Sequence, residues 1–123
     1  PLARTDLAEK LASQVAKSIE KGAKNILGGV RENNFFEPTL LTDIQPNSPA
    51  FVEEMFGPVA TVFRVKNETE AVGLANNHRY GLAGSIWTQD QERGYRLARQ
   101  LDTGKRAFGD WTKRVCQLQN HLD

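Results

Sequence analysis

The feature that most constrains the fold is an alternation between helical and strand-like apolar patterns. Apolar side chains recur every four positions over residues 5–21, which predicts an amphipathic helix. Helical patterns also occupy residues 69–77 and 89–101. Residues 59–65 (VATVFRV) and 82–88 read as strands between them. The alternation predicts an α/β fold with three layers, helix/sheet/helix, and a mostly parallel sheet.

Local signals set the expected ends of these elements. Thr5 or Asp6 can cap the first helix, and Gly22 suits a left-handed turn after it. Residues 25–29 predict a very short strand, and Pro38 should confine residues 35–44 to an edge or to the first part of a strand. Two sets of side chains are expected to face a core, one in the first helix and one in the third: Leu7, Leu11, Val15 and Ile19; Tyr95, Leu97, Ala98 and Leu101.

Composition excludes several classes of protein. Sixteen basic and 15 acidic residues are interspersed along the 123 positions, so neither a nucleic-acid partner nor a charged membrane surface is indicated. No apolar run approaches the ~20 residues of a membrane span, and no signal peptide is recognisable. The single cysteine, Cys116, cannot form an internal disulfide, and we expect a cytoplasmic protein.

Three motifs together resemble those of the aldehyde dehydrogenase family. They are residues 36–41 (FEPTLL), 53–59 (EEMFGPV) and 75–83 (ANNHRYGLA), in an order and spacing similar to that family. Residues 101–104 (LDTG) resemble a further family turn, and residues 1–7 (PLARTDL) look most similar to succinate-semialdehyde-type members. The resemblance implies a partial catalytic domain over residues 1–104, with residues 105–123 as a divergent tail in which Arg106 replaces an expected apolar residue.

Two side chains of the second motif match cofactor-contacting positions of the family. The resemblance implies that Glu54 accepts hydrogen bonds from the nicotinamide ribose of NAD or NADP and that Phe56 packs beside the nicotinamide ring. A carboxylate suits a pair of hydroxyls, and an aromatic ring suits a flat apolar group. The other interpretation of residues 53–58 is a solvated loop whose phenylalanine is tucked into the core.

The remaining candidate residues favour structural roles. His78 has no second His or Cys at ligand spacing, so no metal site is predicted. Tyr80 reads as part of a turn, and Trp87 and Trp111 read as packing residues. Cys116 follows every matched motif, whereas the family nucleophile precedes them, so it is interpreted as an incidental thiol and no catalytic residue is assigned.

Two functions are compatible with these observations. The resemblance implies a fragment of an oxidoreductase that oxidises an aldehyde, succinate semialdehyde among the candidates, to a carboxylic acid with NAD(P)+ through a cysteine thiohemiacetal. Nucleophile, base and the glycine-rich dinucleotide turn are missing, so the chain alone is expected to be inactive, to bind no cofactor and to self-associate. The alternative is a non-catalytic nucleotide-binding or protein-interaction module that reuses the fold.

Overall fold

The computed structural model describes residues 1–77, 83–103, 105–110 and 113–119, the last two ranges by their backbone only. Contacts divide the chain into two compact units, Pro1–Arg64 and Val65–Asp123. The division predicted at residue 104 does not coincide with this boundary and stays a prediction. No helix within the described ranges is long and apolar enough to cross a membrane.

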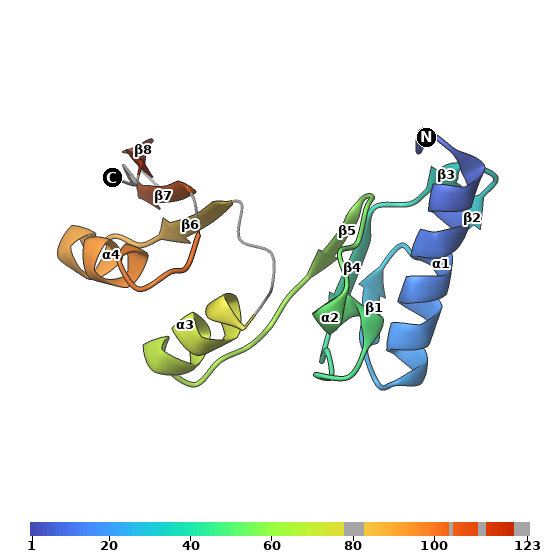
Figure 1. Ribbon diagram of the computed structural model, residues 1–123, viewed down its shortest axis with the longest axis horizontal. Coiled ribbons are helices and arrows are strands. Elements are labelled where there is room, and N and C mark those ends of the chain that lie inside the picture. The colour runs from blue at the N-terminus through green and yellow to red at the C-terminus, as the bar shows by residue number, and fades with distance from the viewer. Residues whose placement is uncertain (78–82, 104, 111–112, 120–123) are drawn as a thin grey trace. The chain divides into compact units, whose positions relative to one another are not determined.

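The first unit is a small mixed sheet flanked by a long helix (Figure 1). Its elements are α1 (Thr5–Glu20), β1 (Lys24–Leu27), β2 (Arg31–Glu32), β3 (Phe35–Phe36), β4 (Thr39–Thr42), α2 (Pro49–Val52) and β5 (Val59–Thr61). The strand order is β1-β4-β5, with β1 antiparallel and β5 parallel to β4, and β2 and β3 form a separate antiparallel pair.

The core of this unit lies between α1 and the strands. Leu11 and Val15 of α1 are buried together with Leu41 of β4 and Phe36 of β3. The apolar stripe predicted on this helix is confirmed in its middle, whereas Ile19 near its end remains 40% exposed. The four-residue spacing therefore identifies the buried face of α1 correctly, although its last position, Ile19, is not covered by the core.

The start of α1 differs from its prediction. The N-cap is Arg4, which makes no side-chain cap hydrogen bond, while Thr5 and Asp6 lie inside the first turn. Arg4 instead donates from Nε and Nη2 to the Asp6 carboxylate at 2.9 and 2.6 Å. Asp6 therefore pairs with the side chain of the N-cap residue and is not itself the N-cap. At the other end, Gly22 adopts φ +104°, the left-handed turn expected of it.

Two extended segments are shorter than predicted. Pro38 stands directly before β4, and the predicted segment 35–44 divides there into β3 and β4. The strand predicted over residues 59–65 ends at Thr61. Its neighbour β4 ends at Thr42, and Asp43 turns away with φ +55°, so the backbone beyond Val62 has no strand beside it.

The second unit contains a β-α-β crossover. Its elements are α3 (Glu68–Asn76), β6 (Ala83–Trp87), α4 (Gln91–Ala98), β7 (Lys105–Asp110) and β8 (Lys113–Gln119). The strand order is β6-β7-β8, with β6 and β7 parallel and β7 and β8 antiparallel. Helix α4 contacts both parallel strands.

The α/β class is confirmed, and both three-stranded sheets are mixed where a mostly parallel sheet was predicted. Each contains one parallel and one antiparallel pairing. The connection between β7 and β8 spans only two positions, which is too short for the crossover that a parallel pair requires. Among the residues predicted to face a core from the third helix, Ala98 and Leu101 are buried, Leu97 is half-buried and Tyr95 is 37% exposed.

Candidate functional site

The candidate site is the loop of residues 53–58, which follows α2 and precedes β5. Helix α2 begins with Pro49 in its first turn and ends at Val52, because the C-cap residue Glu53 has an extended backbone (φ −111°, ψ 157°). The Glu53 N–H still donates to the Pro49 carbonyl at 2.9 Å. The loop thus leaves a short, well-defined helix in an extended direction.

A buried amide of α1 contacts the start of this loop. Gln14 is only 5% exposed, and its Nε2 donates to Glu53 Oε2 at 2.7 Å and to the Glu54 carbonyl at 3.3 Å. The contact joins positions 39 and 40 residues apart in the sequence. A bond from a buried amide to a carboxylate is charge-assisted, so it is stronger than an ordinary side-chain hydrogen bond.

One turn further along α1, Ser18 contacts the beginning of α2. Its hydroxyl is fully buried, donates to the Gln14 carbonyl at 2.7 Å and accepts from the Ala50 N–H at 2.9 Å. Gln14 and Ser18 therefore connect α1 to both ends of α2. The sequence interpretation missed both residues, although two polar positions four apart beside Leu11 and Val15 were a visible signal.

The far end of the loop also approaches α1. Gly57 has φ +148°, a conformation open essentially to glycine alone, and a Cβ placed there would overlap Cδ2 of Leu11. Pro58 follows, and its carbonyl accepts from the Thr39 N–H of β4 at 2.8 Å. The backbone conformation therefore requires glycine at this position, and any added Cβ would also force the buried Leu11 side chain to shift.

Between these supports, the two predicted cofactor-contacting side chains project outward. Glu54 is exposed, and its carboxylate has no hydrogen-bond or ion-pair partner among the side chains described. Phe56 is 63% exposed, which contradicts the interpretation that its ring is tucked into the core. Met55 instead packs against the core of the unit. The alternation along the loop directs Met55 inward and leaves Glu54 and Phe56 available to a ligand.

A separate hollow in the same unit contains an ion pair in its lining. It is lined by residues of β1, β4 and the segment after β5, including Lys24, Asp43, Phe63 and Arg64. Lys24 Nζ lies 2.8 Å from Asp43 Oδ2. The hydrogen bond from Lys24, together with its charge, lowers the pKa of Asp43. No predicted site residue lines this hollow, and its carboxylate serves the ion pair.

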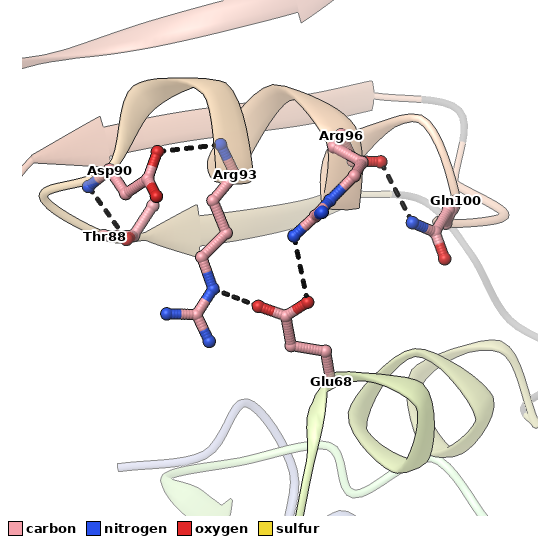
Figure 2. A network of polar contacts seen from close by, with 6 residues as sticks. All are labelled: Glu68, Thr88, Asp90, Arg93, Arg96 and Gln100. Atoms are coloured by element: carbon pink, nitrogen blue, oxygen red, sulfur yellow. Dashed lines mark hydrogen bonds and ion pairs between the residues drawn. The ribbon is translucent and has the colours of Figure 1, made fainter.

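In the second unit, polar contacts connect helix α3 to helix α4 (Figure 2). Glu68, at the start of α3, points toward α4 and accepts from Arg93 Nε and, at 3.2 Å, from Arg96 Nη2. Asp90 caps α4 by accepting from the Arg93 N–H at 3.0 Å. These charges satisfy one another, so the network reads as a structural connection between α3 and α4.

The other sequence candidates add no group to the loop. His78, Tyr80 and Trp111 lie outside the described residues, and only the backbone of Cys116 is described, within β8. Trp87, predicted as a packing residue, is 49% exposed, and its Nε1 donates to Ser85 Oγ at 3.3 Å. The described side chains contain no group of three or more His, Cys, Asp or Glu that could hold a metal ion.

Comparisons with known proteins agree with the motifs. The sequence pattern of the aldehyde dehydrogenase family matches residues 1–121. A succinate-semialdehyde dehydrogenase [NADP(+)] of Deinococcus radiodurans is 47% identical over 107 residues, which cover 85% of this chain and 22% of that protein. The mitochondrial succinate-semialdehyde dehydrogenase of Mus musculus is 41% identical over 107 residues, 85% of this chain and 20% of its own length.

Solved structures give the same result. The succinate-semialdehyde dehydrogenase of Burkholderia pseudomallei superposes with a TM-score of 0.81 at 38% identity, over 89% of this chain and 23% of that one. The enzyme of Streptococcus pyogenes in complex with NADP+ superposes with a TM-score of 0.79 at 28% identity, over 89% and 24%. The chain thus spans about a fifth to a quarter of the length of these relatives, and it belongs to the aldehyde dehydrogenase family.

Proposed function

We propose that this chain is the part of an NAD(P)+-dependent aldehyde dehydrogenase that holds the nicotinamide riboside of the cofactor. In the intact enzyme Glu54 would bind the ribose hydroxyls and Phe56 would pack beside the nicotinamide. The observation that carries the proposal is that an exposed carboxylate, without a partner among the described side chains, and an exposed aromatic ring lie two positions apart on a loop that α1 contacts. The cofactor, when bound, supplies the acceptor for the hydride that aldehyde oxidation releases.

The residue types suit that task. Glu54 can accept two hydrogen bonds from neighbouring hydroxyls, one on each carboxylate oxygen, and the negative charge strengthens both. The ring of Phe56 offers a flat apolar surface that restricts how a second ring can lie. Gly57, whose φ of +148° only glycine adopts without strain, follows Phe56 in the loop. This chain's own contribution is therefore to bind and orient.

We further propose succinate semialdehyde as the aldehyde oxidised by the intact enzyme and either NAD+ or NADP+ as its oxidant. The similarity to succinate-semialdehyde dehydrogenases supports the first, and relatives named for NADP(+) and for NAD(P)+ support the second. The single cysteine, Cys116, suits a reducing compartment, and we propose the cytoplasm.

The test compares the 123-residue chain with the intact protein that carries it. We expect the intact protein to form NAD(P)H from succinate semialdehyde and Glu54→Gln to raise its KM for NAD(P)+ by roughly tenfold, the loss of about 1.4 kcal/mol of hydrogen bonding. The chain alone should show neither turnover nor calorimetric binding of NAD+ or NADP+. Nucleotide binding by the chain alone would instead favour the non-catalytic module, and turnover abolished by Cys116→Ser would refute the assignment of Cys116 as incidental.

We also propose that the chain alone self-associates through apolar side chains that the intact enzyme covers. Many large apolar residues of the described chain are exposed, and contiguous surface of this kind favours association. The most exposed are Phe56, Leu27, Val30, Ile26 and Phe35. Light scattering after size exclusion should give a mass above one chain, increasing with concentration. A single monomeric peak at every concentration would exclude the proposal.

A further inference from the structure

We propose that Gln14 is a positioning residue for the cofactor carboxylate: its buried amide sets the orientation of Glu54 by binding both the side chain before it and its own carbonyl. This inference rests on the proposed role of Glu54. It adds a residue of α1 that lies 40 positions away in the sequence and contacts no ligand.

The geometry of the amide supports this assignment. The two N–H groups of one Gln14 nitrogen have two separate acceptors, Glu53 Oε2 at 2.7 Å and the Glu54 carbonyl at 3.3 Å. A single donor atom thus restrains two consecutive residues at once. Restraining the carbonyl of Glu54 limits rotation of the peptide that follows it, and hence the direction in which its side chain leaves the backbone.

Burial makes the restraint rigid. Gln14 is 5% exposed, and the Ser18 hydroxyl, one turn later, donates to the Gln14 carbonyl and so restrains the helix backbone at that position. An amide in such a site has few alternative partners, and leaving it unpaired costs about 1–3 kcal/mol. The Glu53 carboxylate is exposed and accepts the hydrogen bond of Gln14, whereas the neighbouring Glu54 carboxylate has no partner among the described side chains.

The expected benefit is preorganisation. A carboxylate that already points toward its ligand loses less conformational freedom on binding than one on a mobile loop. Loss of the restraint should therefore weaken cofactor binding while the turnover number at saturating cofactor changes little. A residue that only stabilises the fold would lower the amount of active protein without changing the KM for the cofactor.

The experiment is a double-mutant cycle in the intact protein, with Gln14→Met and Glu54→Gln measured singly and together. We expect Gln14→Met to raise the KM for NADP+ and its calorimetric Kd by roughly three- to tenfold, about 0.7–1.4 kcal/mol, at nearly unchanged kcat. In the Glu54→Gln background the same change should add less than about twofold, because the residue through which it acts is already impaired. Val15→Ala, the next position on α1, removes buried surface without touching the loop's hydrogen bonds and serves as the control for lost stability.

A second variant guards against misfolding of Gln14→Met. Glu53→Ala removes the same hydrogen bond from the exposed side and should raise the KM for NADP+ in the same direction. Independent, additive effects of Gln14 and Glu54, or an equal rise in KM for Val15→Ala, would overturn the positioning role. An unchanged KM in Gln14→Met and Glu53→Ala beside a raised KM in Glu54→Gln would refute this inference alone, whereas an unchanged KM in Glu54→Gln would refute the proposed function as well.

Discussion

Different kinds of contact stabilise the interior of each of the two units. In Pro1–Arg64 a contiguous core of buried apolar residues extends from α1 through the strands to α2. Among the described side chains of Val65–Asp123 the buried ones are Gly94, Ala98 and Leu101, and α3 buries none. Polar contacts between helices and turns are prominent there instead. The candidate site thus lies on the unit with its own core, and we expect that unit to be the more protected one.

The largest effect is expected from Leu11→Ala. Leu11 is 1% exposed and central to the core of the first unit, so its truncation should destabilise that unit by about 2–5 kcal/mol. Amide hydrogen exchange should lose protection over Pro1–Arg64 and keep it over the second unit. Leu27→Ala, at a position 62% exposed, is the matched control and should have little effect. Equal loss of protection in both units would show that they unfold together in spite of their different cores.

Gly57→Ala should come next, because it combines a backbone penalty with a steric one. The φ of +148° costs a residue with a side chain about 1–3 kcal/mol, and the overlap with Leu11 adds to it. The control is Gly73→Ala in α3 of the second unit, where a Cβ meets no atom within 4 Å. That change should stabilise by up to about 1 kcal/mol, because alanine favours helix. The two melting temperatures should move in opposite directions. A decrease of both would contradict the claim that Gly57, unlike Gly73, is required by its local geometry.

Some elements of the fold could be predicted from the sequence and others could not. The three longer helices followed from local patterns: the prediction for α3 was residues 69–77, and the helix is Glu68–Asn76. The short helix α2 (Pro49–Val52) was not predicted. The fold class followed from the alternation of helical and strand patterns, and the family followed from the order of the motifs. The ends of β4 and β5 did not, because they depend on where Asp43 turns the chain away.

The candidate loop shows the same limit. Glu54 and Phe56 could be named from a motif, and their role in binding cofactor stays a prediction. The polar positions Gln14 and Ser18 beside the apolar stripe could have been noticed, but the partners of Gln14 could not be named, because Glu53 and Glu54 are 39 and 40 positions away. Met55 could not be identified as the inward residue either, since Phe56 is the larger apolar side chain and its exposure is decided by packing.

In the second unit, Asn76→Ala should have a moderate effect. The Asn76 amide donates to the Gln100 carbonyl at 2.7 Å and accepts from the Asp102 N–H at 2.9 Å, which ties the end of α3 to the turn after α4. Loss of both bonds should cost about 1–2 kcal/mol. Hydrogen exchange should report it as faster exchange at Asp102. Asn77→Ala is the neighbouring control, and an equal effect there would mean that helix propensity, not the bridge, is responsible.

Glu68→Gln should have a smaller and salt-dependent effect. Glu68 bridges Arg93 and Arg96, but these side chains are 51% and 63% exposed, so solvent screens the attraction. We expect a loss of about 0.2–1 kcal/mol in low salt, measured by denaturant unfolding. The difference from the unchanged chain should shrink in 1 M salt, where the Debye length is about 3 Å. A loss that does not depend on salt would indicate that packing, not charge, joins α3 to α4.

The smallest effect is expected from Asp43→Asn in the first unit. The hydrogen bond from Lys24 lowers the pKa of Asp43, and the same contact raises the pKa of Lys24. Because the pKa of Asp43 is lowered, its charged form stabilises the fold above the ordinary pKa of about 4, and this contribution is lost as the pH falls through the folded-state pKa. Because the pKa of Lys24 is raised, its contribution is lost as the pH rises beyond about 10.4. Asparagine tolerates the φ of +55° at this position, so the substitution removes charge and leaves the turn intact. The melting temperature of Asp43→Asn should therefore be slightly lower at pH 7, and the difference should shrink as the pH falls below about 4. A deficit that does not shrink at low pH would mean that the turn itself needs the aspartate, and the hollow between β1, β4 and the segment after β5 would then depend on backbone geometry instead of on its ion pair.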